Sequence, residues 1–369
     1  MQKTQHCSYT TGKLAPGCKL CVQGKKEVIF ITGLCSEKCF FCPLSEQKKN
    51  RDVIYANEWP VQNLKDIITE AELCESKGAG ITGGDPMIRL SRTVKVIRML
   101  KQRFGKRFHI HLYTPLTHVT VENLKRLHRA GLDEIRFHPK LDNKKLWNRI
   151  GLASQFSWSV GVEIPAIPGT ERQTKELIDF IEVDFLNLNE LEISTTNAEE
   201  LLKRGFVAKD RSSYAIKGSE ELALRLLRYC ETKGTSTHYC TTKLKDSVQL
   251  AKRIKRRARN VAKPYDHVTR EGMLIRGAVY LQETIPGFSY RKRMQSLDKR
   301  KTLEKLKKLR HDIAKLGIDK KMLAIDDKKL RILTSTGIAR KLSKHYPCAI
   351  VEEYPTWDQF EVEVEMLRR

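Results

Sequence analysis

The chain has 369 residues, of which 40% are hydrophobic and 31% charged, so it can bury a large core and fits a soluble globular protein. No apolar run approaches the roughly 18–20 residues that span a bilayer, and the N-terminus lacks the apolar core of a signal peptide, so we expect a cytoplasmic protein without membrane contact. The 69 Lys and Arg residues exceed the 44 Asp and Glu residues by 25, a net charge that predicts attraction to polyanions such as RNA or DNA.

From residue 26 to about residue 195, short β-branched runs alternate with amphipathic stretches. Repeated β-then-α units predict a parallel sheet with right-handed crossovers, which curls into a full or partial (β/α) barrel of the TIM type. The expected strands are 26–33, 78–84, 107–114, 133–139, 160–167 and 185–193, and the expected helices are 61–78, 91–105, 120–131 and 170–183.

Beyond residue 195 the pattern loosens. We expect helices at 197–205 and 219–234, a last short strand at 236–242, and then a basic helix that ends near Pro264. A very basic helical stretch follows at 291–317, and residues 329–369 read as strand, helix, strand, strand. The predicted division is an N-terminal cysteine-containing segment (1–25), an α/β barrel (26–245) and a basic α+β extension (246–369).

Three cysteines, Cys35, Cys39 and Cys42, lie just after the first predicted strand with the spacing C-x3-C-x2-C. Active sites of such barrels form at the carboxyl ends of the strands, so these thiols lie on the catalytic face. Three thiolates on a [4Fe–4S] cube leave one iron open, which is a catalytic feature. The alternative is a zinc knuckle that a remote His or Cys completes.

This stretch resembles the radical S-adenosylmethionine (radical SAM) enzymes, and more narrowly an archaeal-type subgroup related to the pyruvate formate-lyase activating enzymes. The resemblance implies that Cys35, Cys39 and Cys42 bind a [4Fe–4S] cluster and that Phe41 lies near the adenine of S-adenosylmethionine. In that family the open iron binds S-adenosylmethionine, which is cleaved to a 5′-deoxyadenosyl radical that abstracts hydrogen from a substrate. The resemblance also implies an electron donor such as ferredoxin or flavodoxin.

The second predicted strand ends in GGDP, with Gly83, Gly84 and Asp85. It is similar to the family's GGEP-like turn, whose backbone faces the amino group of S-adenosylmethionine, although Asp replaces the usual Glu. Glycine permits the close backbone approach that such a contact needs. The alternative is an ordinary strand-to-helix turn.

Further candidates for cofactor binding stand at the ends of later strands. Thr114 follows Tyr113 in the third, Arg136 precedes His138 in the fourth, and the fifth carries Glu163 and Ile167 in a segment that resembles the family's adenine- and ribose-contacting part. In the sixth strand Asn187 shares a face with Asn189. We expect Arg136 to contact a carboxylate, because its fork suits bidentate pairing. For Arg136, His138, Asn187 and Asn189 the alternative is buried structural hydrogen bonding.

A second group of cysteines lies upstream, with Cys7, Cys18 and Cys21 spaced C-x10-C-x2-C. Cys240 or His238, in a late strand expected to lie next to the N-terminus, would supply a fourth ligand. We expect either a structural zinc ion or a second iron–sulfur cluster here, and unligated cysteines are the alternative.

Basic helices at 252–259 and 305–310 resemble the footprint of an RNA-binding surface. Our first hypothesis is therefore a radical SAM enzyme that modifies RNA, most readily tRNA. The first alternative is a glycyl-radical-enzyme activase or another enzyme that modifies a protein or peptide. The second is a non-enzymatic nucleic-acid-binding protein with structural zinc sites.

Overall fold

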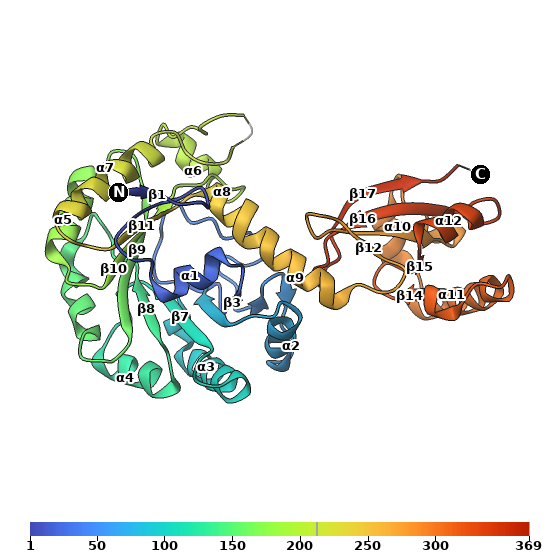
Figure 1. Ribbon diagram of the computed structural model, residues 1–369, viewed down its shortest axis with the longest axis horizontal. Coiled ribbons are helices and arrows are strands. Elements are labelled where there is room, and N and C mark those ends of the chain that lie inside the picture. Colours follow the sequence, from blue (N-terminus) through green and yellow to red (C-terminus); the bar gives the residue numbers. More distant parts are fainter. Residues whose placement is uncertain (212, 369) are drawn as a thin grey trace. The chain divides into compact units, whose positions relative to one another are not determined.

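The computed structural model describes residues 1–211 and 213–368, and of Arg291 the backbone alone (Figure 1). Ser212, within the predicted barrel segment, and Arg369, within the predicted extension, lie outside the described residues. The chain forms two compact units, Met1–Arg253 and Ile254–Arg369. The segment boundaries expected at 25/26 and 245/246 remain predictions.

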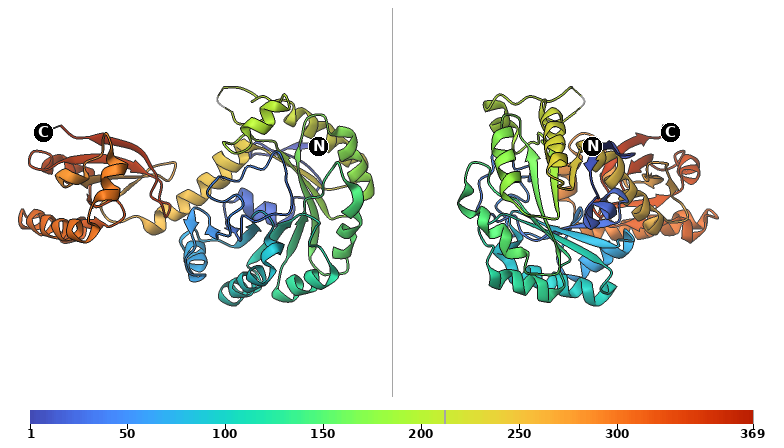
Figure 2. Two further views of the ribbon diagram at one scale, coloured as in Figure 1. Left: turned by 180° about the vertical axis from the view of Figure 1, so that it is seen from behind. Right: turned by 60° about the vertical axis from the view of Figure 1, so that its left-hand side comes forward.

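The first unit is built on a row of parallel strands that curve around a common interior, with helices on the outer face (Figures 1 and 2). The predicted α/β architecture of a partial barrel is therefore confirmed. The parallel strands follow the order β11-β10-β9-β8-β7-β6-β3, and two short strands, β4 (Tyr55–Ala56) and β5 (Trp59–Pro60), extend the sheet beyond β3. The parallel strands are β3 Lys26–Phe30, β6 Gly78–Thr82, β7 His109–Thr114, β8 Glu134–Phe137, β9 Ser159–Ala166, β10 Phe185–Glu190 and β11 Thr237–Cys240. The α-helices that follow β3 in the chain are α2 Lys65–Leu73, α3 Leu90–Phe104, α4 Val121–Ala130, α5 Glu171–Phe180, α6 Ala198–Lys203, α7 Ser219–Thr232 and α8 Thr242–Leu244.

Helix α4 shows how local sequence sets these elements. The Thr120 side chain accepts a hydrogen bond from the Asn123 amide and caps the first turn. Leu124 and Leu127 are completely buried against the sheet. The helix ends at Gly131, whose φ of 98° is a left-handed conformation that favours glycine. Each outer helix thereby returns the chain to the amino end of the next strand.

The N-terminal segment fills the inside of the barrel. Strand β2 (Tyr9–Thr11) pairs antiparallel with β11 and with β1 (Gln2–Lys3), so the last parallel strand lies next to the N-terminus, as expected. Helix α1 (Pro16–Val22) lies within the curve of the parallel strands in both views (Figures 1 and 2). A Cβ at Gly17 would lie only 2.6 Å from Arg136 Nη2, so glycine is what lets α1 approach the strands this closely.

The second unit is an antiparallel sheet of strand order β14-β15-β13-β16-β17, with β12 paired to β13. The single helical stretch expected at 291–317 is instead two helices, because Asp298 caps a new start by accepting a hydrogen bond from the Lys301 amide. Helix α9 (Ala251–Val261) contains the boundary between the two units. The other elements of the second unit are β12 His267–Val268, β13 Leu274–Val279, α10 Tyr290–Ser296, α11 Lys299–Lys315, β14 Ala324–Asp326, β15 Arg331–Thr334, α12 Thr336–Leu342, β16 Cys348–Glu353 and β17 Glu361–Met366.

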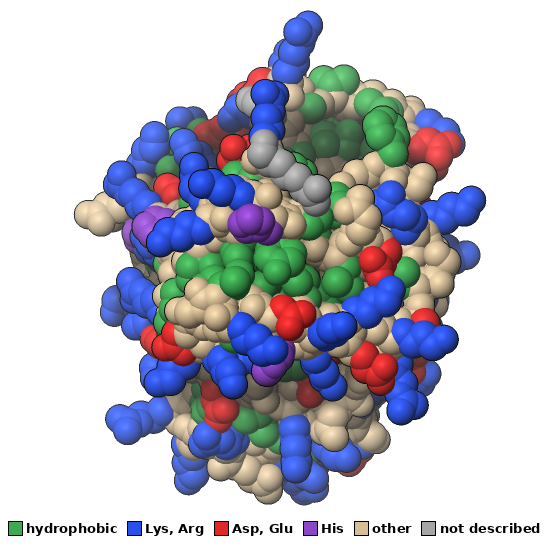
Figure 3. Space-filling view, turned by 90° about the vertical axis from the view of Figure 1, so that its right-hand side faces the viewer, with side chains coloured by type: hydrophobic (Ala, Val, Ile, Leu, Met, Phe, Trp, Pro, Cys, Tyr) green, Lys and Arg blue, Asp and Glu red, His purple; other side chains and the backbone are tan. Residues whose placement is uncertain are grey.

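Many Lys and Arg side chains stand out from the face of the molecule that Figure 3 shows. Residues 254–369 carry 28 Lys and Arg against 15 Asp and Glu, a net charge of +13. Within the described residues, no helix combines the length and the apolar character that crossing a membrane requires.

Candidate active site

The loop with Cys35, Cys39 and Cys42 follows β3 directly, at the carboxyl end of the parallel strands. All three thiols are free and partly exposed. The Cys42 amide donates a 3.2 Å hydrogen bond to the Cys39 carbonyl oxygen, which turns the loop back on itself. Burial, and after it the neighbouring Cys35 and Cys42, raise the pKa of the Cys39 thiol to about 12. The three thiols therefore lie close enough to influence one another electrostatically.

The glycine turn after β6 lies against the start of this loop. The Gly84 amide donates a 2.8 Å hydrogen bond to the Thr32 carbonyl oxygen, and the Asp85 amide donates one of the same length to the Leu34 carbonyl oxygen. A Cβ at Gly83 would lie 2.4 Å from the Thr32 carbonyl oxygen, and one at Gly84 the same distance from that of Leu34. Neither position accepts a side chain without moving the backbone of the cysteine loop.

Asp85 is completely buried beside this turn. Its Oδ1 accepts hydrogen bonds of 2.9 Å from the Met87 amide and from the Thr114 hydroxyl. Its Oδ2 has no hydrogen-bond partner among the described residues, and the imidazole Nε2 of His118 lies 4.0 Å away. Burial raises the pKa of this carboxyl. An unpaired buried acceptor is costly, so the site is suited to a ligand that donates a hydrogen bond.

Phe41 packs in an apolar cluster at the same face. Its ring centroid lies 5.1 Å from that of Phe40 and 5.8 Å from that of His138. Ile167 belongs to the same cluster, so the two residues that the sequence suggested near adenine are brought together. The side-chain amide of Asn197 donates a 3.0 Å hydrogen bond to the Phe41 carbonyl oxygen and so holds the cysteine loop in place.

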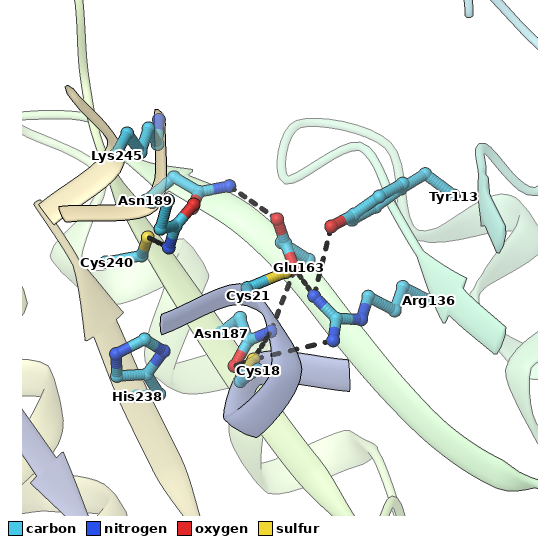
Figure 4. Close-up of a pocket in the computed structure, with 11 residues that line it drawn as sticks. Cys18, Cys21, Tyr113, Arg136, Glu163, Asn187, Asn189, His238, Cys240 and Lys245 are labelled. Carbon is cyan, nitrogen blue, oxygen red and sulfur yellow. Dashed lines mark hydrogen bonds and ion pairs between the residues drawn. The ribbon is translucent and has the colours of Figure 1, made fainter. Parts of the chain in front are cut away.

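Inside the barrel, Glu163 is the centre of a polar network (Figure 4). Its carboxylate accepts hydrogen bonds from Arg136 at 2.7 Å, Asn187 at 2.8 Å and Asn189 at 2.9 Å. Although burial opposes it, the charge of Arg136 and the amide donors keep the pKa of Glu163 below its ordinary value. These polar groups are thus paired, as their burial requires.

Arg136 is fully engaged within the protein. Besides Glu163 it pairs with Glu134 at 2.5 Å and donates to the Tyr113 hydroxyl at 3.1 Å and to the Cys18 sulfur at 3.4 Å. Its guanidinium therefore belongs to a buried structural network, and its expected contact with a carboxylate of substrate or cofactor remains a prediction. The same holds for the roles of Glu163 and Asn187.

A cavity of about 180 Å³ opens beside this network. Cys18 and Cys21 reach it from α1, and Cys240 reaches it from β11 (Figure 4). Cys7, which we expected in the same group, is not among the lining residues; its carbonyl oxygen instead accepts a hydrogen bond from the Thr241 hydroxyl. Across the part of the chain that the structure describes, no three His, Cys, Asp or Glu side chains are arranged to hold a single metal ion.

Comparison with known proteins identifies the family. Residues 29–160, which include the cysteine loop and the glycine turn, match the model of the radical SAM superfamily. A Methanocaldococcus jannaschii protein, provisionally named a glycyl-radical enzyme activating enzyme, is 50% identical over 277 residues, covering 72% of this chain and 73% of the relative. This chain belongs to the radical SAM superfamily. It is therefore an enzyme, and the alternative of a non-enzymatic nucleic-acid-binding protein is wrong.

Membership of the radical SAM superfamily implies an iron–sulfur cluster and S-adenosylmethionine as cofactors. Solved structures of radical SAM enzymes are only distantly similar. Methylornithine synthase is 16% identical with a TM-score of 0.37, covering 55% of this chain and 62% of its own. Coproporphyrinogen III oxidase from Escherichia coli is 11% identical with a TM-score of 0.37, covering 61% of this chain and 58% of its own. This chain thus spans less than two thirds of either, and nothing about substrate follows from them.

The sequence pattern did not predict two residues that line the cavity of the barrel, Lys245 and Gln249. They lie on a π-helical turn, Lys245–Leu250, which follows β11 and carries both side chains to the cavity wall. The available signal was position, because residues just after a parallel strand lie at the catalytic face. The π-helical geometry itself has no signature in this sequence.

Proposed function

We propose that this chain is an activating enzyme that abstracts hydrogen from a protein substrate. The observation that carries the proposal is its 50% identity, over most of both chains, to the M. jannaschii protein named a glycyl-radical enzyme activating enzyme. The expected cytoplasmic location and an electron donor such as ferredoxin or flavodoxin remain predictions.

In this proposal Cys35, Cys39 and Cys42 hold a [4Fe–4S] cluster, and S-adenosylmethionine binds beside it. When bound and reduced, that pair supplies a 5′-deoxyadenosyl radical. Asp85 Oδ2, which has no hydrogen-bond partner among the described residues, would accept a hydrogen bond from the amino group of S-adenosylmethionine, while the Thr114 hydroxyl holds Asp85 Oδ1. Phe41 and Ile167 provide an apolar surface for the adenine.

The test is to find the origin of the hydrogen that is abstracted. Deuterium-labelled extract from the source organism is separated into protein and RNA fractions, and each is incubated with the reduced, cluster-loaded enzyme and S-adenosylmethionine. We expect deuterium in 5′-deoxyadenosine from the protein fraction, together with a glycyl-radical signal in electron paramagnetic resonance. Deuterium from the RNA fraction alone would contradict an activase.

RNA modification is the second candidate, favoured by the charge of the second unit. A pocket of about 220 Å³ there is lined by the basic residues Lys307, Arg310, His311 and Lys320. Arg310 is held in position by hydrogen bonds to the carbonyl oxygens of Leu323 at 2.9 Å and Lys320 at 3.2 Å. Fixed cations suit phosphate contacts. If RNA is the substrate, tRNA binding should weaken steeply with salt and should fall in the variant Lys307→Ala/Arg310→Ala.

The second metal expected near the N-terminus, zinc or a further iron–sulfur cluster, remains a prediction.

A further inference from the structure

Three cysteines that lie far apart in the sequence, Cys18, Cys21 and Cys240, line one cavity inside the barrel. The cavity provides about 180 Å³, whereas a single water molecule needs roughly 10–15 Å³ of such space. Its walls are polar or sulfur-bearing, with Glu163, Asn187 and Asn189 among them (Figure 4). It therefore has the size and the lining to hold a group of several atoms.

Hydrogen-bond donors point at one of these sulfur atoms. Arg136 Nη2 lies 3.4 Å and Asn187 Nδ2 lies 3.3 Å from the Cys18 sulfur. Both donors are fixed in turn, because Arg136 pairs with Glu134 and both contact Glu163. N–H groups directed at a cysteine sulfur stabilise it as a thiolate and tune a metal that it binds.

His238 provides a separate observation that points to a ligand. It lines the same cavity and is only 3% exposed. Its Nε2 lies 3.2 Å from the Ser8 hydroxyl, while its Nδ1 has no hydrogen-bond partner among the described residues. An imidazole that one nitrogen anchors while the other stays unpaired has the arrangement of a metal-binding histidine.

We propose that Cys18, Cys21 and Cys240, with His238 Nδ1 as the fourth donor, hold a second iron–sulfur cluster in the barrel interior. Thiolate ligands select soft metals, namely iron–sulfur clusters and zinc. Zinc needs its four donors at about 2.0–2.3 Å from one point. Here Cys18, Cys21 and Cys240 line a cavity of about 180 Å³, a size that favours the larger group. The proposal of this second cluster does not depend on whether the enzyme acts on a protein substrate.

The test compares two triple variants of the full chain after anaerobic reconstitution with iron and sulfide. In Cys35→Ala/Cys39→Ala/Cys42→Ala the interior network is untouched, so about four iron and four sulfide per chain should remain, against about eight in the wild type. Cys18→Ala/Cys21→Ala/Cys240→Ala should likewise retain about four. The control Cys230→Ala, which removes a completely buried thiol of α7, should retain the wild-type content.

Absence of iron from the first variant would overturn the proposal, whatever the folding of the second. So would loss of zinc without loss of iron from the second variant. His238→Gln provides a milder check, because it should change the Mössbauer parameters of the cluster that remains in the first variant. Unchanged parameters would remove His238 from the ligand set.

Discussion

The two units of this protein differ in the surroundings of their buried charged side chains. In the second unit Glu353 is completely buried, and its two oxygens bond Arg276 at 2.7 Å and Arg331 at 2.6 Å. Those guanidiniums use their other N–H groups on Asp266, Asp326 and Glu361. In the barrel, by contrast, Glu163 and Arg136 line a cavity, and His238 Nδ1 in the same lining has no hydrogen-bond partner among the described residues.

This difference indicates which buried polar groups stabilise the fold and which are available to bind a ligand. An ion network whose members bond one another needs no ligand, so we expect it to serve folding. Asp85 Oδ2 and His238 Nδ1 have no hydrogen-bond partner among the described residues, and a ligand that pairs with such an atom offsets the cost of its burial. The barrel should therefore respond to substitution through its cofactors, and the second unit through its stability.

Removing a ligand thiol should have the largest effect on function. In Cys42→Ala we expect the cluster of the loop to be lost, because two thiolates on a short exposed loop cannot retain it. Iron analysis and the visible absorbance of reconstituted protein measure this. Far-UV circular dichroism should be unchanged, since Cys42 is partly exposed and outside the core. A Cys42→Ala protein with wild-type iron content would show that this loop is not the cluster site.

Breaking the paired network should have the largest effect on stability. Glu353→Ala leaves two buried guanidiniums short of a partner and should cost about 3–5 kcal/mol of unfolding free energy. Urea denaturation followed by fluorescence measures the loss. Glu352→Ala, at the neighbouring position where the residue is partly exposed, is the matched control and should cost far less. Equal losses would mean that the ion network contributes nothing specific.

The unpaired carboxylate oxygen predicts a smaller, ligand-dependent effect. Asp85→Asn keeps the size of the side chain but removes its charge, and should weaken S-adenosylmethionine binding by roughly tenfold or more, the value of a hydrogen bond to a charged group. Calorimetric titration of cluster-loaded protein measures the affinity. The exposed Glu122→Gln provides the control. Unaltered affinity in Asp85→Asn would remove this residue from the cofactor site.

The smallest effect concerns pH. Arg92, Thr32 and Arg89 hold the pKa of Asp52 below its usual range by donating hydrogen bonds to it. A carboxyl with a depressed folded-state pKa stabilises above its unfolded pKa of about 3.9 and loses that stabilisation as pH falls. Asp52→Asn should thus cost about 1 kcal/mol at pH 7, and the difference from wild type should shrink below pH 4. Urea unfolding at pH 7, 5 and 3 tests this, and a pH-independent difference would contradict it.

Much of this fold follows from the sequence, because each β/α unit carries its own periodicity and its own end signals. Thr120 and Gly131, for example, mark the ends of α4. The interior helix α1 could not be predicted in this way. It spans only Pro16–Val22, too short for a helical period to show, and Gly17 is fitted to partners on β7 and β8 that lie more than 90 residues away.

The candidate site likewise has features that local sequence predicts and features that depend on tertiary structure. The cysteine loop and the GGDP turn are local patterns, so their spacing was sufficient to suggest them. The exclusion of Cys7 from the cavity was not predictable, because it depends on the pairing of β2 with β11 and on the turn before it. Spacing alone grouped Cys7 with Cys18 and Cys21, and the expected position of the last strand next to the N-terminus added Cys240 or His238. The cavity is lined by Cys18, Cys21, His238 and Cys240, and Cys7 is not among its lining residues.

The most direct test of the account is the formation of 5′-deoxyadenosine from S-adenosylmethionine by reduced, cluster-loaded enzyme under anaerobic conditions. We predict that the wild type and Cys230→Ala form it and that Cys35→Ala forms none. A wild-type enzyme that holds its full iron content and binds S-adenosylmethionine but forms no 5′-deoxyadenosine, or a Cys35→Ala enzyme as active as the wild type, would contradict it.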